Sequence, residues 1–207
     1  MKIKMSQPQC SRDARYLAPV TLNVKCRKMY DTKKYLGVDL KQQFKLMPHN
    51  PIWTEIFQDE ATKIKGKIST WIIDIQHFGS TAVPGLMAKP LIDIIIGIES
   101  FSDWIYIKGP IEDLGYIRDK YAQPHHPVFY KPEIREFHLH INEINSPEWQ
   151  RNIGFRDLLI SDSNVRKEYE KVKLKAIQAY PDNYTMIKNP FISKILQRII
   201  TTYPLTE

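Results

Sequence analysis

Residues 71–98 read WIIDIQHFGSTAVPGLMAKPLIDIIIGI, and this stretch decides the fold. Its first eight residues are rich in β-branched and aromatic side chains, and its last eight form a nearly continuous apolar run. Both patterns are typical of β-strands, and the glycines and prolines between them indicate a tight connection. We therefore predict two strands, over 71–78 and 91–98. The second strand is expected to be buried on both faces because it lacks polar alternation.

One residue interrupts the second apolar run. Asp93 is a carboxylate among isoleucines, and burying its charge is costly unless a metal ion or another cation compensates. The turn Gly79-Ser80-Thr81 offers backbone N–H groups and two hydroxyls, which suits a bound phosphate. The alternatives are an internal salt bridge for Asp93 and a turn that its own hydroxyls stabilise.

Two histidines alternate along a third predicted strand, FHLHI at residues 137–141. Because alternate side chains of a strand face the same side, the imidazoles of His138 and His140 should lie together. That spacing suits a shared metal ion, a pair of phosphate contacts, or a general base with the residue that orients it. A polar face exposed to water is the alternative. If this strand neighbours the one that carries Asp93, all three side chains share one site.

Three segments of the chain resemble one protein family. Residues 77–94, HFGSTAVPGLMAKPLIDI, closely resemble the signature of the GrpB family. Residues 127–177 are similar to the family's His-x-His strand and its Phe-Arg-Asp helix, and residues 184–199 to its closing Tyr-x-x-x-Lys helix. The resemblance implies a nucleotidyltransferase-like α+β fold of the polymerase-β type. We expect a mixed or antiparallel β-sheet flanked by helices, with further helices at the C-terminal end.

The resemblance also implies an activity. A protein of this type would bind a nucleoside triphosphate with Mg²⁺ and transfer a nucleotidyl or phosphoryl group to an acceptor that the sequence does not identify. Asp93 would hold the metal ion, and His138 and His140 would complete the catalytic site or act as base. The superfamily has a second carboxylate two residues further along that strand. This chain has Ile95 there, so whether it is an enzyme stays open.

A larger set of residues is expected to contact the phosphates or the nucleotide. They flank the Gly-Ser turn or match basic positions of the family pattern, and they are His77, Gly79, Ser80, Thr81, Lys89, Lys131, Arg156 and Lys188. Each basic side chain could neutralise phosphate, and an arginine could do so with two parallel hydrogen bonds. The alternative for each of them is a surface cation or a salt bridge, such as one between Arg156 and Asp157.

Two other functions remain open. The first is a non-catalytic module that binds a nucleotide, a coenzyme or a phosphorylated metabolite, and Ile95 favours it. Some GrpB-like domains are fused to dephospho-coenzyme A kinases, which also favours a small ligand of this kind. The second is an interaction protein whose basic N-terminal arm contacts a polyanion or a partner.

Charge divides the 207-residue chain into two parts. Residues 1–43 hold ten basic and three acidic side chains, whereas residues 44–207 hold twenty of each. We predict a basic N-terminal extension over 1–43 and one GrpB-like domain over 44–207. Because a nucleic-acid-binding domain is expected to carry its own basic patch, the domain is not expected to bind nucleic acid.

The remaining composition points to the cytoplasm. The two cysteines, Cys10 and Cys26, lie in the extension, so a disulfide framework for the domain is not expected, although one bridge between them stays open. We expect neither a membrane span nor a secretory signal, because the apolar runs are too short.

Overall fold

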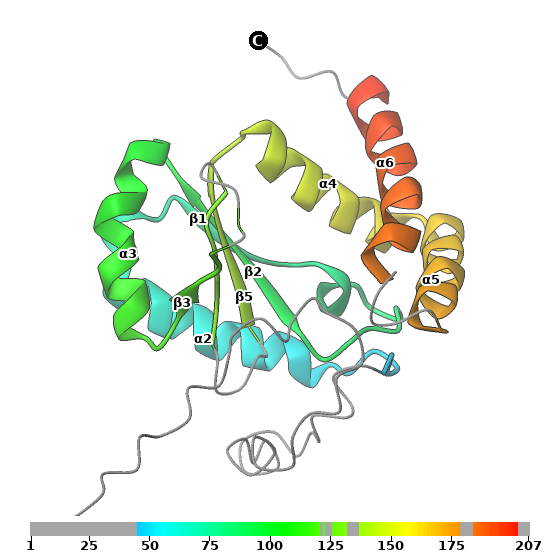
Figure 1. The fold of residues 1–207 in the computed structure, drawn as a ribbon, viewed down its shortest axis with the longest axis horizontal. Coiled ribbons are helices and arrows are strands. Elements are labelled where there is room, and N and C mark those ends of the chain that lie inside the picture. The colour runs from blue at the N-terminus through cyan, green and yellow to red at the C-terminus, as the bar shows by residue number, and fades with distance from the viewer. Residues whose placement is uncertain (1–44, 121, 123–125, 132–136, 179–183, 203–207) are drawn as a thin grey trace, which may run out of the picture.

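The computed structural model describes residues 45–120, 122, 126–131, 137–178 and 184–202 (Figure 1). The predicted extension over 1–43, its boundary with the domain, and both cysteines lie outside these residues. Within the described residues, each helix is too short or too polar to cross a membrane.

A mixed five-stranded sheet forms the centre of the structure, in the order β1-β2-β5-β4-β3. The strands β2 and β5 are parallel, and every other neighbouring pair is antiparallel. The strands are β1 (Asp74–Phe78), β2 (Ile92–Ile98), β3 (Ile117–Arg118), β4 (Val128–Tyr130) and β5 (Phe137–Glu143). The predicted α+β fold, with a mixed sheet flanked by helices, is confirmed.

Helices cover both faces of this sheet (Figure 1). α2 and α3 lie against one face, α4 lies against the other, and α5 and α6 pack on α4 beside the sheet. The helices are α2 (Ile52–Ile68), α3 (Trp104–Asp113), α4 (Pro147–Ser161), α5 (Ser163–Gln178) and α6 (Tyr184–Thr202). Short 3₁₀ turns are η4 (Ser69–Trp71), η5 (Ser80–Ala82) and η6 (Phe101–Asp103).

The first predicted strand begins three residues later than expected. Residues 69–71 form the turn η4, and β1 starts only at Asp74. The indole of Trp71 stacks on the ring of Tyr106 with 4.7 Å between the ring centroids. Trp71 therefore packs outside the sheet. Composition alone does not show whether such a residue lies in a strand or beside one.

The strand β2 is buried on both faces, as predicted. Its even-numbered isoleucines pack with α2 and α3 in the main core, together with Leu139 and Ile141 of β5. Ile95 points to the opposite face, where it packs with Phe78 and Trp149. Full burial of one such aliphatic side chain is worth about 1.5–3 kcal/mol, so β2 anchors both layers.

A second apolar cluster fixes the loop between β1 and β2. Val83 and Leu86 of this loop are fully buried. They pack against residues from the three C-terminal helices, namely Leu159, Val165, Tyr169 and Ile195. This packing places α5 and α6 beside η5 and the end of β1.

A buried carboxylate holds α2 to the far edge of the sheet. Glu60 of α2 is 1% exposed and accepts hydrogen bonds from the Tyr116 hydroxyl at 3.0 Å and from Lys63 at 3.2 Å. The ammonium group of Lys131 forms an ion pair with it at 2.5 Å. Burial raises the pKa of Glu60, but the hydrogen bonds and charges of Lys131 and Lys63 together outweigh this, so the pKa lies below its ordinary value of 4.5.

We predict that Lys131→Met destabilises the fold by about 3–5 kcal/mol, because it leaves the buried Glu60 carboxylate with only the exposed Lys63 as its cation. Lys63→Met is the matched control: the Lys63 side chain is 60% exposed, so its loss should cost less than about 1 kcal/mol. Urea unfolding of both variants measures the two losses, and equal losses would contradict the prediction.

The same variant has an expected pH dependence. Because the pKa of Glu60 is lowered in the folded state, its contribution to stability is complete above the ordinary value of 4.5. The contribution is lost as the pH falls further, through the folded pKa. The difference in unfolding free energy between the wild type and Lys131→Met should therefore shrink in acid.

Candidate functional site

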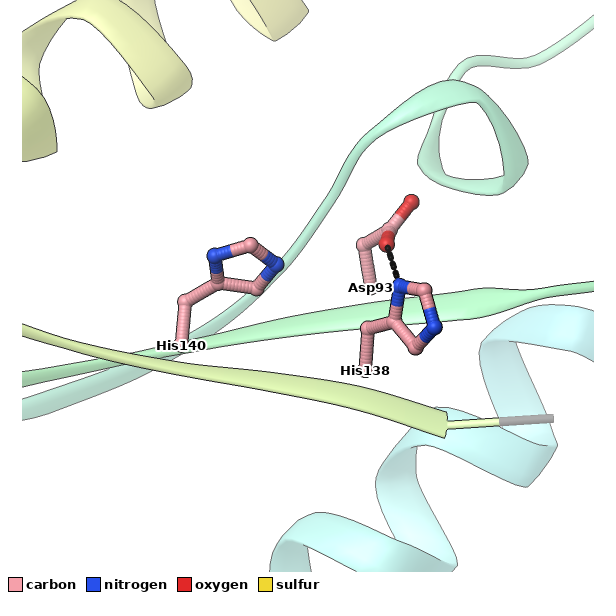
Figure 2. Close-up of side chains that lie close together, drawn as sticks. All are labelled: Asp93, His138 and His140. Atoms are coloured by element: carbon pink, nitrogen blue, oxygen red, sulfur yellow. Dashed lines mark ion pairs between the residues drawn. The ribbon is translucent and has the colours of Figure 1, made fainter. Parts of the chain in front are cut away.

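Asp93, His138 and His140 come together on the face of the sheet that α4 covers. Asp93 belongs to β2 and the two histidines to β5, and Figure 2 shows all three side chains on the same side of the sheet. One possible ligand atom from each residue lies within 4.8 Å of the others. Nδ1 of His138 is 3.7 Å from Oδ1 of Asp93.

The parallel pairing of β2 and β5 produces this arrangement. It aligns Asp93 with His138 and Ile95 with His140, so these four side chains lie on the same face of the sheet. The strand of the two histidines is therefore the neighbour of the strand that carries Asp93, as the sequence required for a shared site. Phe78, aligned with Asp93 on β1, contacts the His140 ring edge-on at 5.0 Å.

The carboxylate of Asp93 leaves no room for a side chain at position 79. The φ of Gly79 is +72°, and a Cβ atom added here would lie 2.2 Å from Oδ2 of Asp93 and 2.9 Å from its Cγ. A side chain at this position would therefore collide with Asp93 and would also adopt a backbone conformation that glycine alone adopts readily. The glycine of the Gly-Ser turn is needed so that β1 can end directly against Asp93.

Burial sets the ionisation of the cluster. It raises the pKa of Asp93 to about 7, although the charges of Lys188 and Lys173 act in the opposite direction. It lowers the pKa of His140 to about 3, with smaller contributions from the charges of His138 and His126. The pKa of His138 is also lowered by burial, against the charge of Asp119. Both imidazoles are therefore neutral near pH 7, which is the form that binds metal ions.

The cluster still reaches the solvent. The side chain of Asp93 is 22% exposed and that of His138 is 43% exposed. Ile95, by contrast, is fully buried between Phe78 and Trp149. His140 is its partner on β5, so an imidazole stands beside this buried isoleucine.

Three lysines add positive charge beside this cluster. The ammonium groups of Lys89 and Lys188 lie 3.7 Å and 4.4 Å from the centroid of the same Tyr184 ring. Lys173 of α5 is 1% exposed, and its ammonium group donates to the carbonyl of Met87. The charges of Lys173 and Lys188 both act on the carboxyl of Asp93.

Burial, and to a smaller extent mutual repulsion, lowers the pKa values of these lysines. Burial, followed by the charge of Lys188, lowers the pKa of Lys173 to about 7 and that of Lys89 to about 8. Burial also lowers the pKa of Lys188, opposed by the charge of Asp93. Cations held together in this way are unfavourable by themselves and are stabilised by an anion. The arrangement is therefore suited to a phosphate group.

Sequence reasoning missed Lys173 and Tyr169. Both lie on the buried stripe of α5, between Val165 and Ala176. The ring of Tyr169 is buried, which raises the pKa of its hydroxyl, and that hydroxyl shares a hydrogen bond with Ser80. A lysine at helical spacing within an apolar stripe is the signal that could have identified Lys173.

The side chains of His77 and Thr81 bind each other. His77 points to the α2 face, where its ring stacks on Phe57 at 5.0 Å. The Thr81 hydroxyl, 1% exposed, donates to the carbonyl of Leu91 at 2.8 Å, so it accepts its 3.0 Å hydrogen bond from Nε2 of His77. These contacts close the connection between β1 and β2, and a role in phosphate binding stays a prediction for both residues.

Lys131 and Arg156 also have partners within the fold. Lys131 is bound to Glu60 on the α2 face. Arg156 donates to the Gln76 side chain at 2.6 Å and to the His77 carbonyl at 2.9 Å, and it forms an ion pair with Asp157 at 2.7 Å. These bonds tie α4 to β1. The structure therefore brings Asp93, His138, His140, Gly79, Ser80, Lys89 and Lys188 together, and it gives the other four predicted residues hydrogen-bond or ion-pair partners within the fold.

We predict that Gly79→Ala destabilises the fold more than Gly85→Ala. Both glycines have positive φ, at +72° and +75°, but a Cβ at Gly85 would meet no atom within 4 Å. Gly85→Ala should cost about 1–2 kcal/mol from backbone strain, and Gly79→Ala a further 1–3 kcal/mol from the collision. Urea unfolding measures both.

Asp93→Ala isolates the collision, because it removes the carboxyl group that the new methyl would meet. The extra cost of Gly79→Ala should fall in the Asp93→Ala background, while the cost of Gly85→Ala should stay the same. An unchanged extra cost would show that backbone strain alone accounts for Gly79.

Comparison with known proteins places the chain in a family. The family model described as "GrpB protein" matches residues 43–198. Glutamate-rich protein GrpB of Alkalihalophilus pseudofirmus is 34% identical over 174 residues, which cover 79% of this chain and 99% of the relative. A dephospho-CoA kinase of Mycolicibacterium paratuberculosis is 26% identical over 184 residues, covering 74% of this chain and 45% of the kinase.

A solved structure agrees with the sequence matches. The crystal structure of conserved protein GrpB from Enterococcus faecalis has a TM-score of 0.69 and 29% identity to this chain, and the match covers 77% of this chain and 99% of that one. The motifs at residues 77–94 and 127–177, which suggested the family, lie within the matched region. This chain belongs to the GrpB family.

Proposed function

We propose that this chain binds a nucleoside triphosphate beside Asp93 and transfers a nucleotidyl or phosphoryl group from it to an acceptor. The observation that carries the proposal is the set of three lysines held next to the Asp93 cluster. Lys173 comes from α5, Lys188 from α6 and Lys89 from the loop before β2. Three separate elements thus supply cations to one place, which supports a ligand with several negative charges.

Each lysine has a physical role in this proposal. A phosphate group would offset the mutual repulsion of Lys173, Lys188 and Lys89 and would favour the protonated form of each. The Ser80 hydroxyl, at the start of η5, would contribute a further hydrogen bond beside them. Lys173 is already oriented by the Met87 carbonyl, and Glu170, which accepts from the Met87 amide at 3.2 Å, acts on its charge.

The histidines differ in their suitability as a base. A general base works best when its pKa lies near the working pH. The pKa of His140 is about 3, which makes it a weak base. The pKa of His138 is also lowered by burial, but the charge of Asp119 opposes this, and the side chain is 43% exposed. We therefore expect His138, rather than His140, to face the acceptor, either as its base or by completing the site around a bound cation.

The magnesium ion that the resemblance implied fits this donor set poorly. Mg²⁺ takes oxygen ligands in octahedral geometry. Asp93 supplies one carboxylate, Ile95 replaces the second, and the other two groups are imidazoles. We accordingly assign no step of the transfer to Mg²⁺.

The second candidate function is a module that binds a nucleotide or a coenzyme without reacting with it. The loss of the second carboxylate at Ile95 favours it. The similarity to a chain named dephospho-CoA kinase supports a ligand of the nucleotide or coenzyme kind. Both functions predict the same lysine contacts and differ only in whether a product forms.

We expect Lys173→Met and Lys188→Met each to weaken nucleoside triphosphate binding by about 10-fold or more, the loss for a hydrogen bond to a charged group. Lys175→Met is the matched control, because Lys175 lies exposed on the same helix as Lys173. Calorimetric titration of the four common nucleoside triphosphates and of dephospho-coenzyme A measures the affinities. Equal effects of Lys173→Met and Lys175→Met would contradict the proposal.

Binding without divalent cations should strengthen as the pH falls from 9 to 6.5. The pKa values of Lys89 and Lys173 are about 8 and about 7, so both lysines gain charge over this range. Calorimetry across the range gives the profile, and Lys173→Met should flatten its lower part. Affinity that does not vary with pH would argue against the lysine contacts.

Product analysis separates the transferase from the binding module. The wild type and His138→Gln are incubated with a bound nucleoside triphosphate and a fractionated metabolite extract as the source of acceptors. A transferase should release pyrophosphate or nucleoside diphosphate in the wild type, and His138→Gln should retain binding but lose turnover. Binding without turnover in the wild type would favour the module.

A further inference from the structure

We infer that Asp93, His138 and His140 form a site for one divalent transition-metal ion of the Zn²⁺, Co²⁺ or Fe²⁺ kind, and that this site selects against Mg²⁺. The inference names the cation of the proposed function. It rests on the geometry of the three side chains and does not require a nucleotide to bind.

The donor atoms decide which kind of ion fits. Two imidazole nitrogens and one carboxylate oxygen make a mixed nitrogen and oxygen set. Imidazole suits Zn²⁺, Fe²⁺, Ni²⁺ and Cu²⁺, whereas Mg²⁺ prefers oxygen ligands and gives up its water reluctantly. Two histidines with one carboxylate also leave coordination positions open, an arrangement found in catalytic zinc sites and in non-haem iron sites.

The separations are compatible with one ion. Ligand atoms bound tetrahedrally to Zn²⁺ at about 2.1 Å lie about 3.4 Å apart. Nδ1 of His138 is already 3.7 Å from Oδ1 of Asp93, and all three residues have a ligand atom within 4.8 Å of the others. Small side-chain rotations would close the remaining difference. All three side chains come from neighbouring strands on one face, so the backbone need not move (Figure 2).

The surrounding residues offer few additional oxygen ligands. Ile95 fills the place of a second carboxylate and is fully buried. The Thr81 hydroxyl is bound to the Leu91 carbonyl, and Ser80 shares a hydrogen bond with Tyr169. Among the residues that the structure describes, this is also the one group of three His, Cys, Asp or Glu side chains with metal-binding geometry.

Metal titration of the full chain tests the inference. The protein is stripped of metal and titrated with Zn²⁺, Co²⁺ and Mg²⁺ in the absence of nucleotide, by calorimetry and by competition with a chromophoric chelator. We expect Zn²⁺ to bind at least 100-fold more tightly than Mg²⁺. His138→Ala and His140→Ala should each weaken Zn²⁺ binding at least tenfold, and the visible absorption of bound Co²⁺ should change in both.

Two features of the chain require controls. Cys10 and Cys26 can also bind zinc, so each variant is compared with the wild type in the same full chain, where both cysteines are present. His49→Gln removes a histidine outside the cluster, one that contacts Trp53, and should leave the affinity for Zn²⁺ unchanged. Circular dichroism establishes that each variant is folded.

His138→Asp provides a second test that does not depend on losing a ligand. It replaces a nitrogen donor with an oxygen donor directly beside Asp93. The ratio of Zn²⁺ to Mg²⁺ affinity should fall at least tenfold, with an absolute gain in affinity for Mg²⁺. The same ratio in His138→Asp as in the wild type would overturn the assignment of His138 as a ligand.

Two results would overturn the inference as a whole. One is an affinity for Mg²⁺ within tenfold of that for Zn²⁺ in the wild type, and the other is Zn²⁺ binding that neither His138→Ala nor His140→Ala weakens. These results are distinguishable from failure of the proposed function. Zinc binding without any nucleotide binding would leave the metal site and remove the transferase, and lysine-dependent nucleotide binding without metal selectivity would do the reverse.

Discussion

The parallel pairing of β2 with β5 is the constraint on which the rest of the structure depends. It joins two strands that lie about 45 residues apart in the chain, and it sets which side chains share a face. The pairing aligns Asp93 with His138, sends the even-numbered isoleucines of β2 to the main core, and leaves the opposite face for the polar cluster. A shift of one residue would place His138 in the apolar core and remove the site.

Much of the fold follows from local sequence patterns. The apolar run of β2, the alternation of His138 and His140, and the Ser146-Pro147 start of α4 each rest on neighbouring residues, and the Ser146 hydroxyl accepts from the Trp149 amide as such a start requires. The late start of β1 was not predictable in this way, because Trp71 has strand-like composition but packs on Tyr106, a residue of α3. Tertiary contacts decided that boundary.

The site was predictable only in part for the same reason. His77 precedes the Gly-Ser turn in sequence, yet its position in the β1–β2 register sends it to the face opposite Asp93. Lys131 is similar: it directly follows Tyr130, but it pairs with Glu60 on the α2 side. The spacing of Lys173 on the apolar stripe of α5 indicates burial, but it does not indicate that this lysine meets a loop some 86 residues earlier. The strand register determines the face on which His77 lies, and the packing of the helices determines the partners of Lys131 and Lys173.

Val83 and Leu86 pack against the C-terminal helices, so both the sheet and these helices contribute residues to the site. Lys173 and Lys188 reach Asp93 only while α5 and α6 are docked on the β1–β2 loop. Docking of these helices and binding of any anion at the lysines are therefore thermodynamically linked. A bound anion would slow local opening of α6, protect its amides from hydrogen exchange and shield its end from proteases, far beyond the atoms that the ligand touches.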